Sequence, residues 1–291
     1  MPAMKGNSVL QESGAPFIVI FSDLDGTLLD HDNYEWAEAK PALDLCRKLD
    51  FPIVLVSSKT RAEMEPLRRE MSISDPFITE NGGGIFFPST VIAEPLPGAS
   101  PVDGPEGLWE LSLGVPYRHL VKTLQEIREE LGLNLKGFSD MEIDEVSSLT
   151  GLDPEASRLA VMREYDEPFV ISHEQPSDIT ALIDAAGQRG LTVTTGGRFF
   201  HLQGGNDKGQ SMEMIVSWYE RSRGRVSSIA LGDSPNDFPM LERADYPILI
   251  RSRRDFPVLR EKIPRLTVTR EMGPSGWNSA ILDILKTKVK G

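Results

Sequence analysis

Short, uninterrupted apolar runs constrain the fold of this chain more than any other feature. Each run covers only a few residues, and segments with helical periodicity separate them. Apolar residues at successive positions indicate strands buried on both faces, which is typical of a parallel sheet covered by helices. The pattern predicts an α/β fold with core strands at Phe17–Phe21, Phe51–Ser57, Phe77–Thr79, Ser228–Leu231, Tyr246–Ile250 and Leu266–Val268.

A long stretch between the third and fourth of these strands has its own pattern of elements. Residues 90–100 are rich in Pro and Ala, and Asp103-Gly104-Pro105 follows, which marks a boundary. The strands expected beyond it are Leu108–Leu113, Pro168–Ser172, Leu191–Thr195 and Arg198–Gln203, with a hairpin turn at Gly196-Gly197 between the last two. The expected helices are Pro116–Leu131, Pro154–Arg163 and Ser177–Gly187. We therefore predict an N-terminal tail (1–15), a core (16–104 and 204–291) and an inserted α/β cap domain (105–203).

The composition narrows the possible partners. The 291 residues include 31 Lys and Arg against 44 Asp and Glu, and a net charge of −13 argues against a nucleic-acid partner, whose phosphates need clustered cations. No segment approaches the roughly 20 consecutive apolar residues that span a bilayer, so we expect no membrane association. The single cysteine, Cys46, sits in a helical pattern and is expected to be buried. Because no internal disulfide is possible, a cytoplasmic location is expected.

Two carboxylates follow the first strand directly. Asp23 and Asp25 are spaced i, i+2, and Gly26 and Thr27 add a tight turn and a hydroxyl. This is the arrangement that an aspartyl nucleophile needs, with the second carboxylate handling the proton and a divalent cation lowering their repulsion. A polar strand end with Asp-Gly turn chemistry is the alternative interpretation.

Three later segments supply matching chemistry. Ser57 places a hydroxyl at a strand end, although Ser57-Ser58-Lys59-Thr60 also reads as a helix cap. Lys208 is a glycine-flanked cation before a helix, where a plain surface lysine is the alternative. Asp233 and Asp237 follow the strand at Ser228–Leu231, and carboxylates of this kind hold Mg²⁺, where a turn-rich loop without a metal is the alternative. Because sites in open α/β sheets lie at the carboxyl ends of strands, these side chains are expected to converge.

These four segments, in this order, resemble the four motifs of the haloacid dehalogenase (HAD) superfamily of phosphohydrolases. The resemblance implies a HAD-type Rossmann-like core, with Asp23 as nucleophile and Asp25 as general acid/base. It implies that Ser57 binds the substrate phosphate and that Lys208 neutralises it. It also implies Mg²⁺ as cofactor, with ligands at Asp23, Asp25 (through its backbone carbonyl), Asp233 and Asp237.

Further segments resemble one family of this superfamily, the mannosyl-3-phosphoglycerate phosphatases. They occur over nearly the whole chain after residue 15, at residues 57–60, 80–83, 163–169, 197–201, 207–209 and 273–278. The resemblance implies hydrolysis of a glycosyl-3-phosphoglycerate, with the mannosyl compound as first choice, to glycosylglycerate and phosphate through an aspartyl-phosphate, as in mannosylglycerate biosynthesis. The candidate substrate-binding residues are Ser58, Lys59, Asn81, Gly82, Gly83, Arg163, Arg198, His201 and Asn236.

Three of the distal side chains have purely structural alternatives. Arg163 could pair with Glu164 or Glu167 on the surface. His201 alternates out of phase with the apolar residues beside it, so it could be an exposed strand residue. Trp277, in the last of the matching segments, is interpreted as a packing anchor for the C-terminal helix.

Other functions remain open at this point. Another sugar phosphate, such as sucrose phosphate, is an alternative substrate, and a phosphomutase of similar fold is an alternative enzyme. A catalytically silent ligand-binding module is the alternative from a different class. In such a module the crowded carboxylates of the four segments would lower stability without serving catalysis. For the glycosyl-3-phosphoglycerate interpretation the expected partner is a small phosphorylated sugar acid. No feature of the sequence indicates an oligomeric state.

Overall fold

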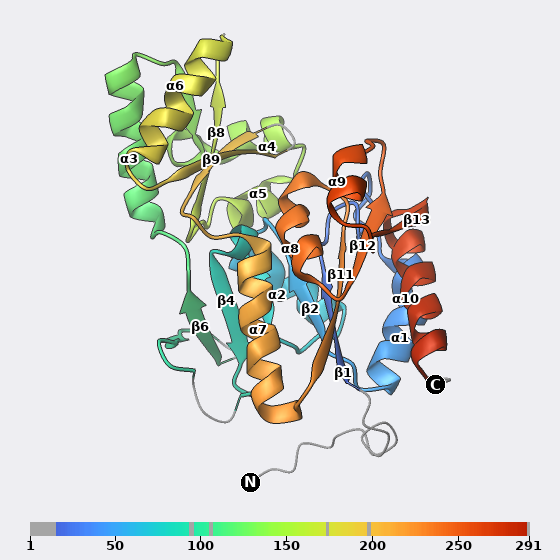
Figure 1. Ribbon diagram of the computed structural model, residues 1–291. Coiled ribbons are helices and arrows are strands. Elements are labelled where there is room, and N and C mark those ends of the chain that lie inside the picture. Colours follow the sequence, from blue (N-terminus) through green and yellow to red (C-terminus); the bar gives the residue numbers. More distant parts are fainter. Residues whose placement is uncertain (1–15, 93–95, 105–106, 173–174, 197–198, 290–291) are drawn as a thin grey trace. The chain divides into compact units, whose positions relative to one another are not determined.

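A computed structural model describes residues 16–92, 96–104, 107–172, 175–196 and 199–289 of the chain (Figure 1). The chain folds into two compact units. The first comprises Met1–Val56, Asp75–Phe77 and Lys208–Gly291, and the second comprises Ser57–Ser74 and Ile78–Asp207. The predicted cap, 105–203, therefore lies within the second unit.

Parallel strands form the centre of the first unit. Their order is β13-β12-β11-β1-β2, and each neighbouring pair is parallel. This confirms the α/β fold with a parallel sheet that the continuous apolar runs predict. The strands are β1 (Phe17–Ser22), β2 (Ile53–Val56), β11 (Val226–Gly232), β12 (Tyr246–Arg251) and β13 (Thr267–Met272).

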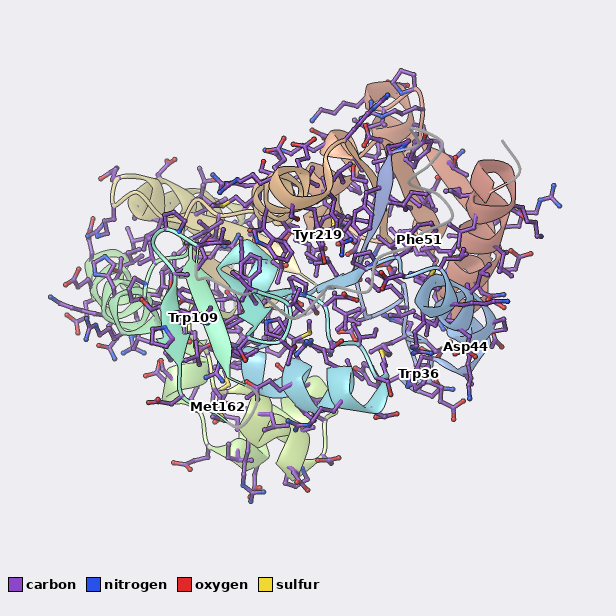
Figure 2. The ribbon with its side chains drawn as sticks, turned by 90° about the horizontal axis from the view of Figure 1, so that it is seen from below. Trp36, Asp44, Phe51, Trp109, Met162 and Tyr219 are labelled. Carbon is purple, nitrogen blue, oxygen red and sulfur yellow. The ribbon has the colours of Figure 1, made fainter. Side chains whose placement is uncertain are left out.

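Helices cover both faces of this sheet (Figure 1). On one face lie α1 (Lys40–Lys48) and α10 (Gly273–Val289), and on the other lie α7 (Lys208–Arg223) and α8 (Phe238–Arg243); α9 (Pro257–Lys262) follows β12. Tyr219, labelled in Figure 2, lies on α7. The centroid of its ring lies 5.6 Å from that of Phe17 on β1. Trp277 of α10 is fully buried, and its Nε1 donates to Ser22 Oγ at 2.9 Å. The interpretation of Trp277 as a packing anchor is confirmed.

The second unit contains two groups of strands. In the first, β4 (Gly84–Pro88), β6 (Leu108–Ser112) and β5 (Ser100–Val102) pair antiparallel. The second is a four-stranded antiparallel sheet of order β7-β8-β10-β9. Its strands are β7 (Leu135–Gly137), β8 (Asp166–Ile171), β10 (Phe199–Gln203) and β9 (Thr192–Gly196).

One face of the four-stranded sheet packs on α3 (Tyr117–Leu131) and α6 (Pro176–Gly187), where Leu124, Phe169 and Leu202 belong to a single buried core. This unit also contains the helices α2 (Arg61–Glu70), α4 (Ile143–Thr150) and α5 (Pro154–Ala160). The boundary between the two units falls within β3 (Phe77–Thr79), between Phe77 and Ile78.

Several predicted boundaries were wrong. β2 begins at Ile53 instead of Phe51, and β13 continues to Met272 instead of ending at Val268. The helix predicted to reach Arg163 ends at Ala160, because the Arg163 side chain itself donates to the Ala160 carbonyl at 2.8 Å. The strand at Leu108–Ser112, expected as the first strand of the cap, pairs with β4 and β5 and is not in the four-stranded sheet.

Two smaller expectations can be compared with the structure. Cys46 is fully buried, as predicted. None of the helices in the described ranges combines the length and the apolarity that a bilayer-spanning segment needs.

Candidate active site

Asp23 emerges at the carboxyl end of β1, and its peptide N–H donates to the Leu231 carbonyl at 2.9 Å. Asp25, half-buried, lies in the turn that follows. Gly26 in this turn has φ +79°, and a Cβ there would lie 2.8 Å from Asp233 Oδ2. Glycine is therefore needed for the backbone conformation and for the close approach of the β1 and β11 loops.

Lys208 is the first residue of α7 and is completely buried. Its Nζ donates to Asp23 Oδ1 at 2.7 Å and to Asp237 Oδ1 at 2.6 Å. Burial alone would lower the pKa of Lys208, but the two carboxylates outweigh burial and hold the pKa above its usual value. The surface-lysine alternative is thus wrong.

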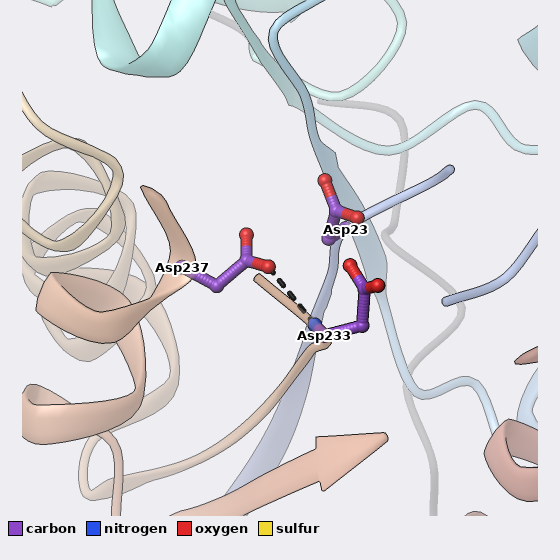
Figure 3. A group of neighbouring side chains, drawn as sticks. All are labelled: Asp23, Asp233 and Asp237. Carbon is purple, nitrogen blue, oxygen red and sulfur yellow. Dashed lines mark hydrogen bonds between the residues drawn. The ribbon is translucent and has the colours of Figure 1, made fainter. Parts of the chain in front are cut away.

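Asp233 begins the loop after β11, and Asp237 closes that loop (Figure 3). Asp237 Oδ2 accepts from the peptide N–H of Asp233 at 3.0 Å and of Ser234 at 3.1 Å. Asp237 therefore ties the conformation of the loop to the position of Lys208. Asn236, the neighbouring candidate, accepts from the Ser234 hydroxyl at 2.6 Å.

Carboxylates gather at this end of the sheet. Ligand atoms of Asp23, Asp233 and Asp237 all lie within 4.8 Å of one another, an arrangement that could hold a metal ion (Figure 3). Burial, then repulsion from Asp237, raises the pKa of Asp23 well above its usual value, against the attraction of Lys208. The same two causes raise the pKa of Asp233 to about 6. One ammonium does not offset three carboxylates, so the donor set fits a hard divalent cation.

The second unit contains the other predicted phosphate and substrate residues. Ser57 follows β2 and is 1% exposed; its Oγ accepts from the Lys59 peptide N–H at 3.2 Å. Thr60 caps α2, so the helix-cap interpretation of this segment is right for that residue. Asn81, Gly82 and Gly83 form a buried loop after β3, with φ +56° at Asn81.

Two candidates predicted from the cap converge on a residue that sequence reasoning missed. Asp166 is fully buried, and its Oδ2 lies 3.4 Å from Arg163 Nη1 and 2.8 Å from His201 Nδ1. The Arg163 side chain is only 8% exposed and that of His201 only 13%. Two alternative interpretations are therefore wrong: that Arg163 forms an ion pair on the surface, and that His201 is an exposed strand residue. Arg198 lies outside the described residues.

Comparisons with known proteins identify the family. Residues 20–97 match the haloacid dehalogenase-like hydrolase family. A glucosyl-3-phosphoglycerate/mannosyl-3-phosphoglycerate phosphatase of Methanococcoides burtonii is 38% identical over 92% of this chain and 97% of its own. The chain belongs to this family of phosphatases. A mannosyl-3-phosphoglycerate phosphatase of Pyrococcus furiosus is 36% identical over 81% of this chain and 92% of its own.

Solved structures show the fold of this HAD phosphatase independently. The protein 0175 of Thermoplasma acidophilum aligns with TM-score 0.64 at 18% identity, over 94% of this chain and 99% of its own. The sucrose-phosphatase of a Synechocystis species aligns with TM-score 0.57 at 15% identity, over 94% and 99%. The HAD-type fold expected from the four motifs is thereby confirmed.

Proposed function

We propose that this phosphatase hydrolyses a glycosyl-3-phosphoglycerate, with the mannosyl compound as first choice, to glycosylglycerate and phosphate. The similarity to relatives named for these substrates supports the proposal, because it extends over both units. The observation that carries the chemistry is the buried Lys208, which bridges two carboxylates at the end of the parallel sheet. The compound acted on is a small anion, and we propose neither a nucleic-acid nor a membrane partner.

In the proposed reaction, Asp23 attacks phosphorus and forms an aspartyl-phosphate, while Asp25 protonates the leaving sugar-acid oxygen. Asp25 then takes a proton from the water that hydrolyses the intermediate. Lys208 holds Asp23 in place and offsets the charge of the phosphate, to which Ser57 donates a hydrogen bond. Mg²⁺, held by Asp23, Asp233 and Asp237 with the Asp25 carbonyl, would supply charge stabilisation and favour ionised Asp23.

The inserted segment 105–203 is proposed to act as the cap that recognises the sugar acid. Arg163 and His201 are candidates to bind the carboxylate and hydroxyl groups of the sugar acid. Both side chains are largely buried, and both contact the Asp166 carboxylate. From the other segments Ser58, Lys59, Asn81, Gly82, Gly83 and Asn236 remain proposed substrate contacts. Arg198 is retained from the sequence alone.

The decisive test is phosphate release with Mg²⁺ across a panel of mannosyl- and glucosyl-3-phosphoglycerate, sucrose phosphate, hexose phosphates and 3-phosphoglycerate. We expect a glycosyl-3-phosphoglycerate to be preferred, and chelation of the metal to stop release. Asp23→Asn should lower kcat by roughly 10³-fold or more while ligand binding persists. Equal, weak rates on all compounds would keep the phosphatase chemistry and reject the proposed substrate.

A further inference from the structure

An unusual backbone follows β3. Glu80, Asn81 and Gly82 have φ values of +46°, +56° and +98°, so three successive residues are left-handed. For a residue other than glycine this conformation costs on the order of 1–3 kcal/mol and persists only where its surroundings enforce it. The reversed backbone directs two peptide N–H groups at the loop after β2. Glu80 N donates to the Lys59 carbonyl at 3.1 Å and Asn81 N to the Ser57 carbonyl at 3.0 Å.

The Glu80 side chain contacts a distant part of the same unit. It has no exposed surface, and its carboxylate accepts from the peptide N–H of Glu164 at 3.0 Å and of Tyr165 at 2.8 Å. Burial raises the pKa of Glu80 to about 8, while the nearby Arg163 lowers it. A buried carboxylate is expensive unless it is hydrogen-bonded, so these contacts hold Glu80 and the segment 163–165 together.

Arg163 connects the segment 163–165 directly to the loop after β2. Its Nη1 donates to the Ser58 carbonyl at 2.9 Å and its Nε to the Ala160 carbonyl at 2.8 Å. The loop Ser57–Lys59 is thus fixed at all three of its carbonyl groups, two by Glu80 and Asn81 and one by Arg163. Because Ser57 Oγ accepts from Lys59 N–H, holding Lys59 also orients the Ser57 hydroxyl and leaves its proton available for donation.

We propose that Glu80 is a positioning residue, which sets the orientation of the Ser57 hydroxyl by holding the loop Ser57–Lys59 and the segment 163–165 in one arrangement. The inference rests on the proposed role of Ser57 as the phosphate ligand. It goes further by making phosphate binding depend on a residue that does not itself touch phosphate. A glutamate that serves packing alone would contribute to stability without any energetic coupling to Ser57.

Glu80→Gln is the sharpest test, because glutamine has the same size but replaces one acceptor oxygen with a donor group that opposes a peptide N–H. The measurement is the Kd for inorganic phosphate by calorimetry with Mg²⁺ on the full chain, at a pH about one unit above the Glu80 pKa of about 8, so that Glu80 is ionised and both its oxygens are acceptors. We expect a rise of about tenfold, the effect of losing roughly one hydrogen bond to the anion. Glu145→Gln is the matched control, since Glu145 pairs with Lys136 at the surface of the same unit, and its Kd should equal that of the wild type.

A cycle with Ser57→Ala separates positioning from packing. If Glu80 acts through Ser57, Glu80→Gln should weaken phosphate binding in the wild type and leave the Ser57→Ala variant nearly unchanged. Equal losses in both backgrounds would overturn the inference, as would no loss in either. If Ser57→Ala alone binds phosphate like the wild type, the proposed role of Ser57 fails, and the inference fails with it.

A second variant covers the case in which Glu80→Gln does not fold. Arg163→Lys keeps the positive charge but cannot reproduce the donor geometry that reaches Ser58 and Ala160. The same rise in Kd is expected, again only when Ser57 is present. A rise that persists in the Ser57→Ala background would contradict positioning through Ser57.

Discussion

At the scale of single residues, the buried ammonium of Lys208 dominates the site. Its Nζ donates to both Asp23 and Asp237, and the side chain has no exposed surface. Removing one partner from a buried charge network leaves the others uncompensated, which costs far more than the loss of a surface pair. The stability of the first unit is therefore expected to depend on the same side chain that is proposed to neutralise the substrate phosphate.

Lys208→Met should lower the free energy of unfolding by roughly 3–5 kcal/mol, because two buried carboxylates lose their cation. Urea denaturation at neutral pH measures the change. Lys262→Met is the control, since Lys262 pairs with Glu242 at the surface, and its cost should stay below about 1 kcal/mol. Equal costs for the two variants would contradict the assigned role of Lys208.

Asp233→Asn tests the proposed metal set at the same scale. Adding Mg²⁺ to the wild type should raise its melting temperature with concentration, because a cation that binds only the folded state stabilises it. The amide lacks the charge of the carboxylate, so the variant should show a much smaller rise. A full Mg²⁺ response in Asp233→Asn would remove this residue from the metal set.

At the scale of elements, the site is built where strands end. Asp23 follows β1 and Asp233 follows β11, and these two strands are parallel neighbours. The last residue of β11, Gly232, allows Asp237 to pack against the strand: a Cβ at Gly232 would lie 2.4 Å from Asp237 Cβ. Because Gly232 has no side chain, Asp237 can approach the strand end closely enough to contact Lys208.

Gly232→Ala should displace Asp237 and with it the Lys208 contact. We expect phosphate release to fall at least about 100-fold and stability to fall by roughly 1–3 kcal/mol, the usual cost of overpacking. The control is Gly187→Ala at the end of α6, where an added Cβ meets nothing within 4 Å. That variant should be neutral or slightly stabilising, and wild-type phosphate release in Gly232→Ala would refute the packing argument.

At the scale of the whole molecule, buried carboxylates make stability depend on pH. The pKa of Glu80 is about 8 in the folded protein against an ordinary value of 4.5. Between these values the folded state holds a proton that the unfolded state has released, so the free energy of unfolding falls as pH rises. The raised pKa of Asp233, about 6, acts in the same direction at lower pH.

Glu80→Gln should reduce this pH dependence between about pH 5 and 8, by at most roughly 1.4 kcal/mol per pH unit. Urea denaturation of metal-free protein at several pH values gives the slope. Stability that falls equally steeply in the variant and the wild type would mean that Glu80 titrates as it does in the unfolded chain.

Local sequence was enough to predict the α/β fold and the phosphatase family. Continuous apolar runs predict the parallel sheet, because both faces of such strands must be buried. The carboxylates placed directly after these runs then had to appear at one end of the sheet, as Asp23 and Asp233 do. Lys208 was identifiable through its glycine-flanked position before a helix and through the order of the motifs.

Only the tertiary structure decided the environment of each group. Three features came from the tertiary structure: the burial of Lys208, the pairing of Arg163 and His201 with Asp166, and the contacts of Glu80 with residues 164 and 165. Each depends on groups that are far apart in the sequence or that lie on different elements. The partnership of β6 with β4 and β5 is likewise a choice between sheets that an apolar pattern does not distinguish. Sequence periodicity reports which face of an element is apolar, whereas the neighbours of a polar group depend on how the elements pack.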